Sequence, residues 1–305
     1  MTVRSRPTLL AAAGAATIAL ALTGCASGQA AGGGAGGAIE VVASTNVWGS
    51  VVKAVGGDAV QVTSIIDDPS KDPHDYEVKP ADTAKISKAA LLVSNGVGYD
   101  DFFAKAVSAA AAKTPSVVAF EVSGKAKTED TNEHVFYDLP TVRKVADKVA
   151  EQLGAVQADK KATFQANAKA LDTKLDELIA RAAKIGTDHP GRQVLVTEPV
   201  ANYLLASAGV RNATPEAFEK AVEAGSDIPV AAVGEATELV SGKKVAALVN
   251  NAQAETEVTK QLKAKAATAG VPVVDVTETL PAGVTDYVVW ISKEVDALSN
   301  ALAKQ

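Results

Sequence analysis

The chain of 305 residues holds only three histidines, and two of them are placed where they could bind a ligand, although a lone histidine in a loop is more often structural or solvent-facing. Neutral imidazole is a common ligand for transition metals and also transfers protons near neutral pH. His74 follows Asp72-Pro73 just beyond a predicted strand, and His134 directly precedes a predicted helix. Loops at the carboxyl ends of parallel strands are where open α/β sheets bind ligands. His189, which stands before a proline, is expected to be a surface residue in a turn.

Two carboxylates in the second half of the chain could complete such a site. Glu198 follows the predicted strand Val194–Thr197, and Asp286 precedes the predicted final helix. A carboxylate at a helix start also has a simple structural explanation, because it can cap free amide groups or complement the helix dipole. Position alone therefore leaves both roles open for Glu198 and Asp286.

The composition indicates an acidic globular protein and argues against several other classes. Lys and Arg number 30 against 36 Asp and Glu, which gives a formal charge of −6. Such an excess of acid argues against electrostatic binding of nucleic acid. With 47% hydrophobic and 22% charged residues, the chain is not a solvated coil. Cys25 is the only cysteine, so neither an internal disulfide nor a thiolate cluster can form.

Residues 1–24 have the pattern of an export signal, with two arginines followed by an apolar run from Leu9 to Leu22. As a helix this run would span only ~21 Å, less than the ~30 Å hydrocarbon core, which disfavours a membrane-spanning anchor. Leu22-Thr23-Gly24-Cys25 resembles a bacterial lipobox, in which the cysteine becomes the lipidated first residue. Residues 25–38 are rich in Gly and Ala and are predicted to form a flexible tether. Their G-x-G-x-x-G match precedes every predicted strand, so we discount a dinucleotide site.

Beyond the tether, short runs rich in Val, Ile and Leu alternate with helical patterns, which predicts parallel sheets covered by helices. The predicted strands are Ile39–Ala43, Val60–Ile66, Leu91–Ser94, Val117–Phe120, Val194–Thr197, Val245–Val249 and Val273–Val276. Between the two sets, apolar residues recur every three or four positions, which predicts one long helix over 158–187. Such a helix is either an ordinary packed helix or a rigid spine between two lobes, and we expect the spine. The lobes are then predicted at 39–157 and 188–305.

An ordered series of motifs runs along nearly the whole mature chain. It consists of Val41-Val42-Ala43-Ser44-Thr45-Asn46-Val47-Trp48, Asp72-Pro73-His74-Asp75-Tyr76-Glu77, Ser94-Asn95-Gly96-Val97-Gly98-Tyr99-Asp100, Glu133-His134-Val135-Phe136-Tyr137-Asp138-Leu139-Pro140, and Glu198 with Tyr203-Leu204. Asp-Pro-His alone would be weak, but the ordered series resembles the substrate-binding lipoproteins of bacterial ABC importers for zinc and manganese.

This resemblance implies two α/β lobes joined by a rigid helix, with one metal ion in the cleft between them. It implies that His74 and His134 bind the ion from the first lobe and Glu198 from the second. The fourth ligand in many members is an Asp near the last helix. A match without a gap places Thr285 there and a shift by one residue places Asp286, which we take as the nearest carboxylate. Two neutral imidazoles and two carboxylates cancel the charge of a divalent cation and suit Zn²⁺ or Mn²⁺ as the transported ligand.

The role implied by the resemblance is to capture the metal outside the cytoplasm and deliver it to an ABC permease and its ATPase. We expect a monomer, not an enzyme, that is held by a lipid on Cys25 at the outer face of the bacterial cytoplasmic membrane. An organic-solute receptor remains an alternative, although aromatic residues make up only 4% of the chain. A metal-dependent hydrolase is a further alternative, although four protein ligands would leave no open position for water. Imidazole ligation also predicts that affinity falls below about pH 6.

Overall fold

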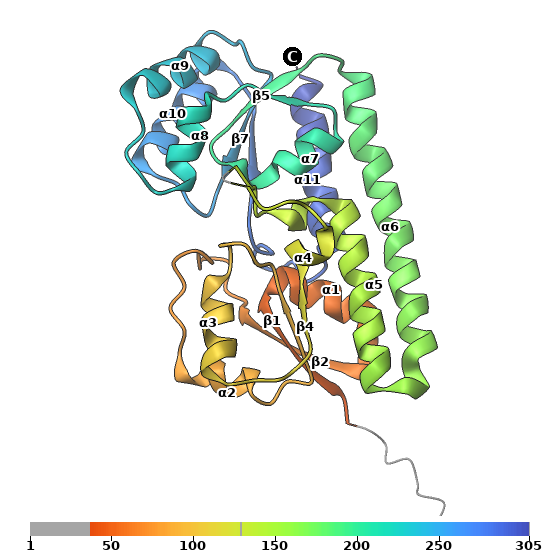
Figure 1. Ribbon diagram of the computed structural model, residues 1–305. Helices are drawn as coiled ribbons and strands as arrows, with labels where there is room; N and C mark the ends of the chain where they lie inside the picture. Colours follow the sequence, from red (N-terminus) through yellow and green to blue (C-terminus); the bar gives the residue numbers. More distant parts are fainter. Residues whose placement is uncertain (1–36, 129, 305) are drawn as a thin grey trace, which may run out of the picture. The chain divides into compact units, whose positions relative to one another are not determined.

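The computed structural model describes residues 37–128 and 130–304, and its first sheet has four parallel strands (Figure 1). In spatial order these strands are β2 (Val60–Ile66), β1 (Ile39–Thr45), β3 (Leu91–Ser94) and β4 (Ser116–Val118). In the centre of this sheet, Val41 of β1 is opposite Val62 on one side and Leu91 on the other. β3 is buried throughout, as is typical of a parallel strand with both faces covered.

The second sheet repeats this arrangement with four more parallel strands. In spatial order they are β6 (Arg211–Asn212), β5 (Gln193–Val196), β7 (Ala247–Asn251) and β8 (Val273–Val276). The seven predicted strands all exist, although β4, β5 and β7 are displaced by one or two residues from the predicted positions. The sequence did not indicate β6, because a strand of two polar residues has no apolar run.

Helices cover both sheets, and we call each sheet with its helices a lobe. The first lobe contains α1 (Asn46–Gly56), α2 (Pro80–Ile86), α3 (Asp101–Ala109), α4 (Ala119–Ser123) and α5 (Leu139–Val156), with short 3₁₀ turns at Gly57–Ala59 and Val135–Tyr137. The second lobe contains α7 (Asn202–Ser207), α8 (Glu216–Glu223), α9 (Val230–Ser241), α10 (Glu257–Ala269) and α11 (Tyr287–Leu302), with a 3₁₀ turn at Pro199–Ala201. The α/β architecture expected from the alternating pattern is therefore confirmed.

A single long helix, α6 (Lys161–Asp188), connects the lobes after a 3₁₀ turn at Ala158–Lys160. Its 28 residues span about 42 Å. The helix packs against α5 and α1 on the first-lobe side and against α11 on the second (Figure 1). Its buried face includes Phe164, Leu175 and Ile185, which keep the predicted helical spacing. The expected spine is thus present, because one rigid element contacts both lobes.

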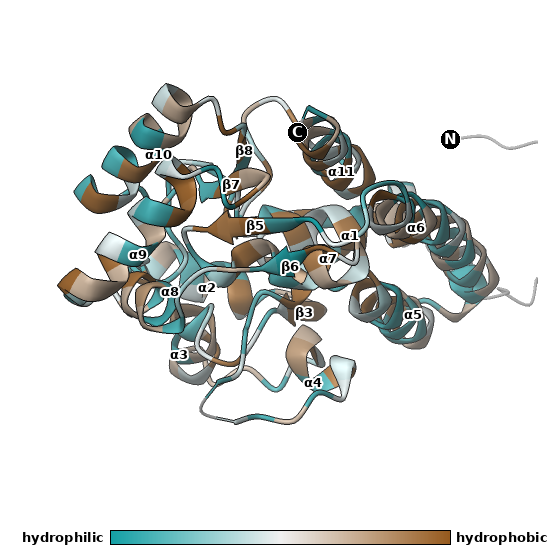
Figure 2. Cartoon of the chain, turned by 90° about the horizontal axis from the view of Figure 1, so that it is seen from above, coloured by the Kyte–Doolittle hydropathy of each residue, from teal (hydrophilic) through white to brown (hydrophobic). Residues whose placement is uncertain are grey.

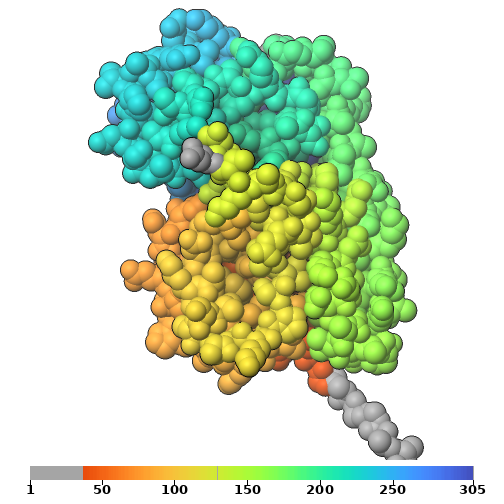
Figure 3. Space-filling model, in the orientation of Figure 1, coloured from red at the N-terminus to blue at the C-terminus, as the bar shows by residue number. Residues whose placement is uncertain are grey.

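Apolar packing continues from one lobe into the other. One cluster of buried side chains contains Val41 of the first sheet, Leu175 of α6 and Val196 of the second sheet. In Figure 2, β5 is brown at the middle of the molecule, whereas α5 and α6 carry teal residues on their outer turns. Figure 3 shows the segment before His134, in yellow-green, lying against the teal surface of the second lobe. The candidate site lies at this junction between the lobes, where contacts between them hold its residues.

Within the described residues, no helix combines the length and the apolar character that a membrane span requires. The predicted signal 1–24, Cys25 and most of the tether 25–38 lie outside the described residues.

Candidate metal centre

Two of the predicted ligands, His74 and His134, lie side by side where the lobes meet, with ring centroids 6.2 Å apart. Glu278, which the sequence analysis did not select, joins them. Its Oε2 atom is 3.7 Å from Nε2 of His74 and 3.8 Å from Nε2 of His134. The ligand atoms of these three side chains all lie within 4.8 Å of one another. Two imidazoles from the first lobe thus meet one carboxylate from the second.

Asn132 fixes the orientation and the tautomer of His134. Its Oδ1 atom accepts hydrogen bonds from the backbone N–H and from Nδ1 of His134, both at 2.9 Å. Because an amide oxygen can only accept, Nδ1 carries the proton and Nε2 keeps its lone pair. Asn132 is itself held by the second lobe. Its Nδ2 donates to the Pro199 carbonyl at 2.8 Å, and the Tyr203 hydroxyl donates to the backbone carbonyl of Asn132 at 2.8 Å.

His74 lies in the loop between β2 and α2, where a local turn sets its position. Oδ1 of Asp72 accepts a hydrogen bond from the backbone N–H of His74 at 2.8 Å, the usual bond of an aspartate-initiated turn. The imidazole ring meets the edge of the Tyr99 ring, with centroids 5.3 Å apart. The His74 side chain is 32% exposed, whereas that of His134 is 1% exposed. Of these two imidazoles, His74 is therefore the one that solvent reaches.

Glu278 stands just beyond β8, and hydrogen bonds with Tyr99, Gln253 and Asn251 hold it. The Tyr99 hydroxyl donates to its carbonyl at 3.0 Å, which ties it to the first lobe. Its backbone N–H donates to Oε1 of Gln253 at 2.5 Å, and Nδ2 of Asn251 donates to its Oε1 at 2.8 Å. These bonds leave Oε2 facing the two histidines.

Glu198 lies next to Glu278 through a shared neighbour, Asn251. The Asn251 amide nitrogen donates to Oε2 of Glu198 as well as to Glu278. Because β5, β7 and β8 are adjacent strands, their carboxyl ends bring these three side chains together. Among the described residues, however, Glu198 is not part of the group in which the imidazole nitrogens and the Glu278 oxygen converge.

Asp286 has a different place from the one expected. It is the N-cap of α11, where its side chain accepts a hydrogen bond from the backbone N–H of Val289 at 3.0 Å. It lines a separate pocket with Asn167 and Lys174, and it belongs to neither set of converging ligand atoms found in the described part of the chain. Asp286 thus caps a helix, which was one of the two roles that its position in the sequence allowed. The carboxylate beside the histidines is that of Glu278.

The electrostatics of the group favour a bound cation. Nε2 of His134 and Oε2 of Glu278 are buried and have no hydrogen-bond partner among the described residues. Burial, with a smaller effect of His74, lowers the pKa of His134 to about 3, so this imidazole is neutral. Burial and the nearby Asp72 raise the pKa of Glu278 to about 8, and burial raises the pKa of Glu198 to about 7. A cation would offset the cost of ionising these buried carboxylates.

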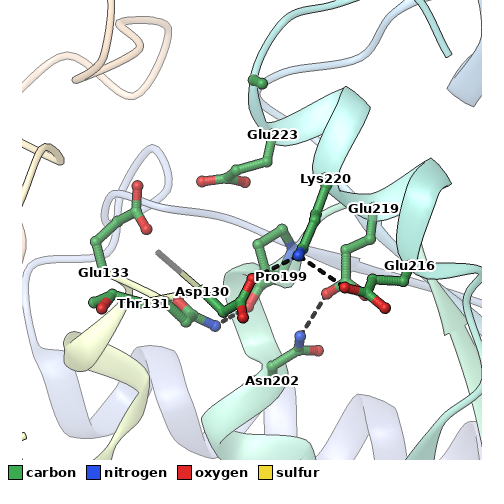
Figure 4. Close-up of a pocket in the computed structure, with 11 residues that line it drawn as sticks. Asp130, Thr131, Glu133, Pro199, Asn202, Glu216, Glu219, Lys220 and Glu223 are labelled. Carbon is green, nitrogen blue, oxygen red and sulfur yellow. Dashed lines mark hydrogen bonds and ion pairs between the residues drawn. The ribbon is translucent and has the colours of Figure 1, made fainter. Parts of the chain in front are cut away.

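An acidic pocket opens beside this group, and Figure 4 shows the side chains that line it. The carboxylates of Glu133 and Glu223 face each other there (Figure 4). Oε1 of Glu223 is 3.9 Å from Nε2 of His134 and is also buried without a hydrogen-bond partner in the described region. Burial and the nearby Glu133 raise the pKa of Glu223.

Glu278, Glu133 and Glu223 were not predicted as ligands from the sequence, although signals for two of them were present. Glu278 follows the strand Val273–Val276, so the rule that drew attention to Glu198 also applies to it. Glu133 directly precedes His134 within a quoted motif. Glu223 gave no such signal, since it ends an ordinary amphipathic helix, α8.

Two parallel α/β lobes, a connecting helix and a histidine–carboxylate group at the lobe junction define a metal-binding receptor of the two-lobed kind. Residues 41–301 match the family described as ZnuA, zinc-uptake complex component A periplasmic. The chain therefore belongs to this family.

Curated relatives and solved structures agree with this membership. The manganese ABC transporter substrate-binding lipoprotein PsaA of Streptococcus mitis is 28% identical over 230 residues, which cover 67% of this chain and 74% of the relative. The iron ABC transporter substrate-binding lipoprotein MtsA of Streptococcus pyogenes serotype M1 is 29% identical over 57% of this chain and 61% of its own length. The periplasmic zinc binding protein TroA of Treponema pallidum shares the fold, with a TM-score of 0.73 and 19% identity over 87% of this chain and 99% of that one.

Family membership also decides between the classes that the sequence left open. The protein is a substrate-binding protein of a divalent-metal ABC importer and not an enzyme, and it acts outside the cytoplasm at the bacterial membrane.

Proposed function

We propose that His74, His134 and Glu278 bind one divalent transition metal, that Glu198 supplies a fourth ligand, and that the protein passes this metal to its permease. The observation that carries the proposal is the convergence of unpartnered atoms. Nε2 of His134 and Oε2 of Glu278 are buried, face each other and have no hydrogen-bond partner among the described residues. Buried polar atoms are seldom left in this state unless an ion or water occupies the space between them.

The distances support an ion rather than a direct hydrogen bond. Each imidazole nitrogen is 3.7 or 3.8 Å from Oε2 of Glu278, whereas a hydrogen bond requires about 2.7–3.2 Å. Two ligands on a tetrahedral ion with bonds of about 2.0–2.2 Å lie about 3.4 Å apart. A small inward movement of each side chain would therefore complete the coordination.

The ligand chemistry favours Zn²⁺ or Mn²⁺ as the cargo. Two neutral imidazoles and the carboxylates of Glu198 and Glu278 would neutralise a divalent ion, which avoids burying a net charge. Oxygen donors favour manganese more than an all-histidine site would, whereas the intrinsic order of affinities favours zinc. Zinc and manganese are also the metals that the names of the family and of the PsaA relative specify.

A competition experiment on the purified protein tests this proposal. Protein stripped with a chelator is titrated with Zn²⁺ and Mn²⁺ separately and together, and the bound metal and the melting temperature are measured. One equivalent of metal should raise the melting temperature by mass action. His134→Ala and Glu278→Gln should each remove most of that rise, whereas His189→Ala should keep it. The site is wrong if both variants still melt like the wild type when metal is added.

We further propose that a lipid on Cys25 anchors the protein, and that an ABC permease with its ATPase receives the metal. The lipobox-like Leu22–Cys25 segment and the lipoprotein names of the relatives support the anchor. Replacement of Cys25 by Ser should shift the protein from the membrane fraction to the soluble fraction of the producing cells. If the Cys25→Ser variant stays in the membrane fraction, the anchor is not at this cysteine.

A further inference from the structure

The acidic pocket next to the metal centre holds a second group of ligand atoms. One atom each from His74, Glu133 and Glu223 lie within 4.8 Å of one another. His74 thus belongs to both groups, with His134 and Glu278 on the buried side and with Glu133 and Glu223 on the pocket side. The His74 side chain is 32% exposed and Glu133 and Glu223 line the pocket, whereas His134 and Glu278 are buried.

A second observation shows that Glu223 faces the metal centre. Its Oε1 atom is 3.9 Å from Nε2 of His134, and neither atom has a hydrogen-bond partner in the described part of the chain. The His134 side chain is 99% buried, so its free lone pair points into an enclosed space and not into solvent. That space is bounded by Glu278 on one side and by Glu223 on the other.

The other charges of the pocket are already paired or hydrogen-bonded. The pocket has a volume of about 830 Å³, and Lys220 is the one basic residue among the side chains described around it. Lys220 forms ion pairs with Asp130 at 2.5 Å and Glu216 at 2.7 Å. Glu219 accepts hydrogen bonds from two asparagine side chains.

Glu133 and Glu223 differ from these neighbours, because no Lys or Arg partner is found for them among the described residues. The two carboxylates face each other instead, so a cation that enters through the pocket would relieve the repulsion between them. One imidazole and two carboxylates form a ligand set that suits divalent transition metals.

We propose that His74, Glu133 and Glu223 form an outer capture position, from which the metal moves to His134 and Glu278 while His74 remains bound. This inference rests on the proposed function and adds an entry step to it. Removing all hydration from a divalent ion at once is expensive, and exchange of one ligand at a time spreads that cost. A ligand shared between the two positions permits such an exchange.

A kinetic experiment with a charge-matched control tests this step. The association and dissociation rates of Mn²⁺ are measured by stopped-flow quenching of protein fluorescence. Glu133→Gln/Glu223→Gln removes two carboxylates next to His74, and Glu216→Gln/Glu219→Gln removes two from the same pocket away from His74. We expect association to slow roughly tenfold in the first double variant and much less in the second, since unspecific steering depends on total charge.

The dissociation rate separates an entry step from direct ligation. If the outer position is a step on the route, dissociation slows together with association and the dissociation constant changes by less than about threefold. If association slows equally in both double variants, the slowing comes only from weaker long-range attraction of Mn²⁺ by the charge of the pocket. That result would overturn the inference. A loss of affinity without slower dissociation would also overturn it, because Glu133 and Glu223 would then stabilise the final bound state.

An equilibrium experiment isolates the outer position. In His134→Ala/Glu278→Ala, Mn²⁺ measured by electron paramagnetic resonance should still bind weakly at one site, and Glu223→Gln added to this variant should abolish the binding. Adding Glu219→Gln instead should leave it intact. If the wild type binds Mn²⁺ tightly and the His134→Ala/Glu278→Ala variant, shown to be folded by circular dichroism, binds none, the outer position is refuted while the proposed function stands.

Discussion

Metal binding at this site should release protons even at pH 8. Ordinary imidazole ligands would release almost none at that pH. The metal replaces protons on buried carboxylates, because Glu278 has a pKa of about 8 and Glu198 a pKa of about 7. At pH 8 these two groups hold about 0.6 protons in the metal-free protein, and at pH 7 about 1.4. His134, with its pKa lowered to about 3 by burial, contributes none. Glu223, whose pKa is also raised, can only add to this release.

Calorimetric titration with Mn²⁺ in buffers of different ionisation enthalpy measures this number directly. Two unperturbed imidazoles would release only about 0.06 protons at pH 8, so the two explanations differ by about tenfold. Glu278→Gln should lower the release at pH 8 by about 0.5 protons, if binding remains measurable. Glu219→Gln, a charge-matched control, should leave it unchanged. Release below about 0.2 protons by the wild type at pH 8 would refute the reasoning.

The same shifts predict how the stability of the metal-free protein depends on pH. Because the pKa of Glu278 is raised on folding from 4.5 to about 8, its stabilising contribution is complete below pH 4.5 and is lost as the pH rises through 8. The loss is on the order of a few kcal/mol. The melting temperature of the metal-free protein should therefore fall from pH 6 to pH 9 while the rise caused by Mn²⁺ grows. The expected loss of affinity below about pH 6 stays a prediction, and the buried carboxylates add a dependence at higher pH.

Three substitutions test how the ligands are held. Asn132→Ala removes the acceptor that fixes the His134 tautomer, and titration should show about 10- to 100-fold weaker metal binding. Gln253→Ala frees the backbone of Glu278 and should weaken metal binding within the same range in the same titration. Asp286→Ala should leave metal affinity unchanged but lower stability by about 1 kcal/mol, or roughly 2–4 °C in melting temperature, because it removes the cap of α11.

Two of these substitutions, Asn132→Ala and Gln253→Ala, have a matched control elsewhere in the chain. Asn167→Ala removes an asparagine that donates to the Val55 carbonyl, and Gln261→Ala removes an exposed glutamine of α10. Neither should alter metal affinity. If Asn132→Ala or Gln253→Ala binds metal as tightly as its control, the corresponding support is not needed for binding. If Asp286→Ala loses affinity, Asp286 and not Glu278 supplies the carboxylate ligand from the segment before α11.

The local pattern of apolar residues in the sequence was sufficient to predict most strands and the long helix of the fold. Runs of Val and Ile predicted the strands, because a parallel strand buried on both faces must be apolar throughout. The spacing of apolar residues from Phe164 to Ile185 predicted α6, because burial of one helix face needs only the helical period. His74 and His134 could also be predicted from the sequence, since so few histidines occur and both lie in loops ahead of predicted helices. β6 was missed, because its pairing comes from the neighbouring β5 and not from its own residues.

Which carboxylates meet the histidines was decided only by the tertiary structure. In sequence, Asp286 and Glu278 are both acidic residues in the segment between β8 and the last helix, and nothing local distinguishes a cap from a ligand. The packing of the lobes distinguishes them, because Tyr99 of the first lobe and Gln253 of the second hold Glu278 against the imidazoles. Glu223 reaches His134 across the same junction from a helix whose own pattern is ordinary. Contacts between distant parts of the chain depend on how whole elements pack, and residue spacing along one element carries no information about that.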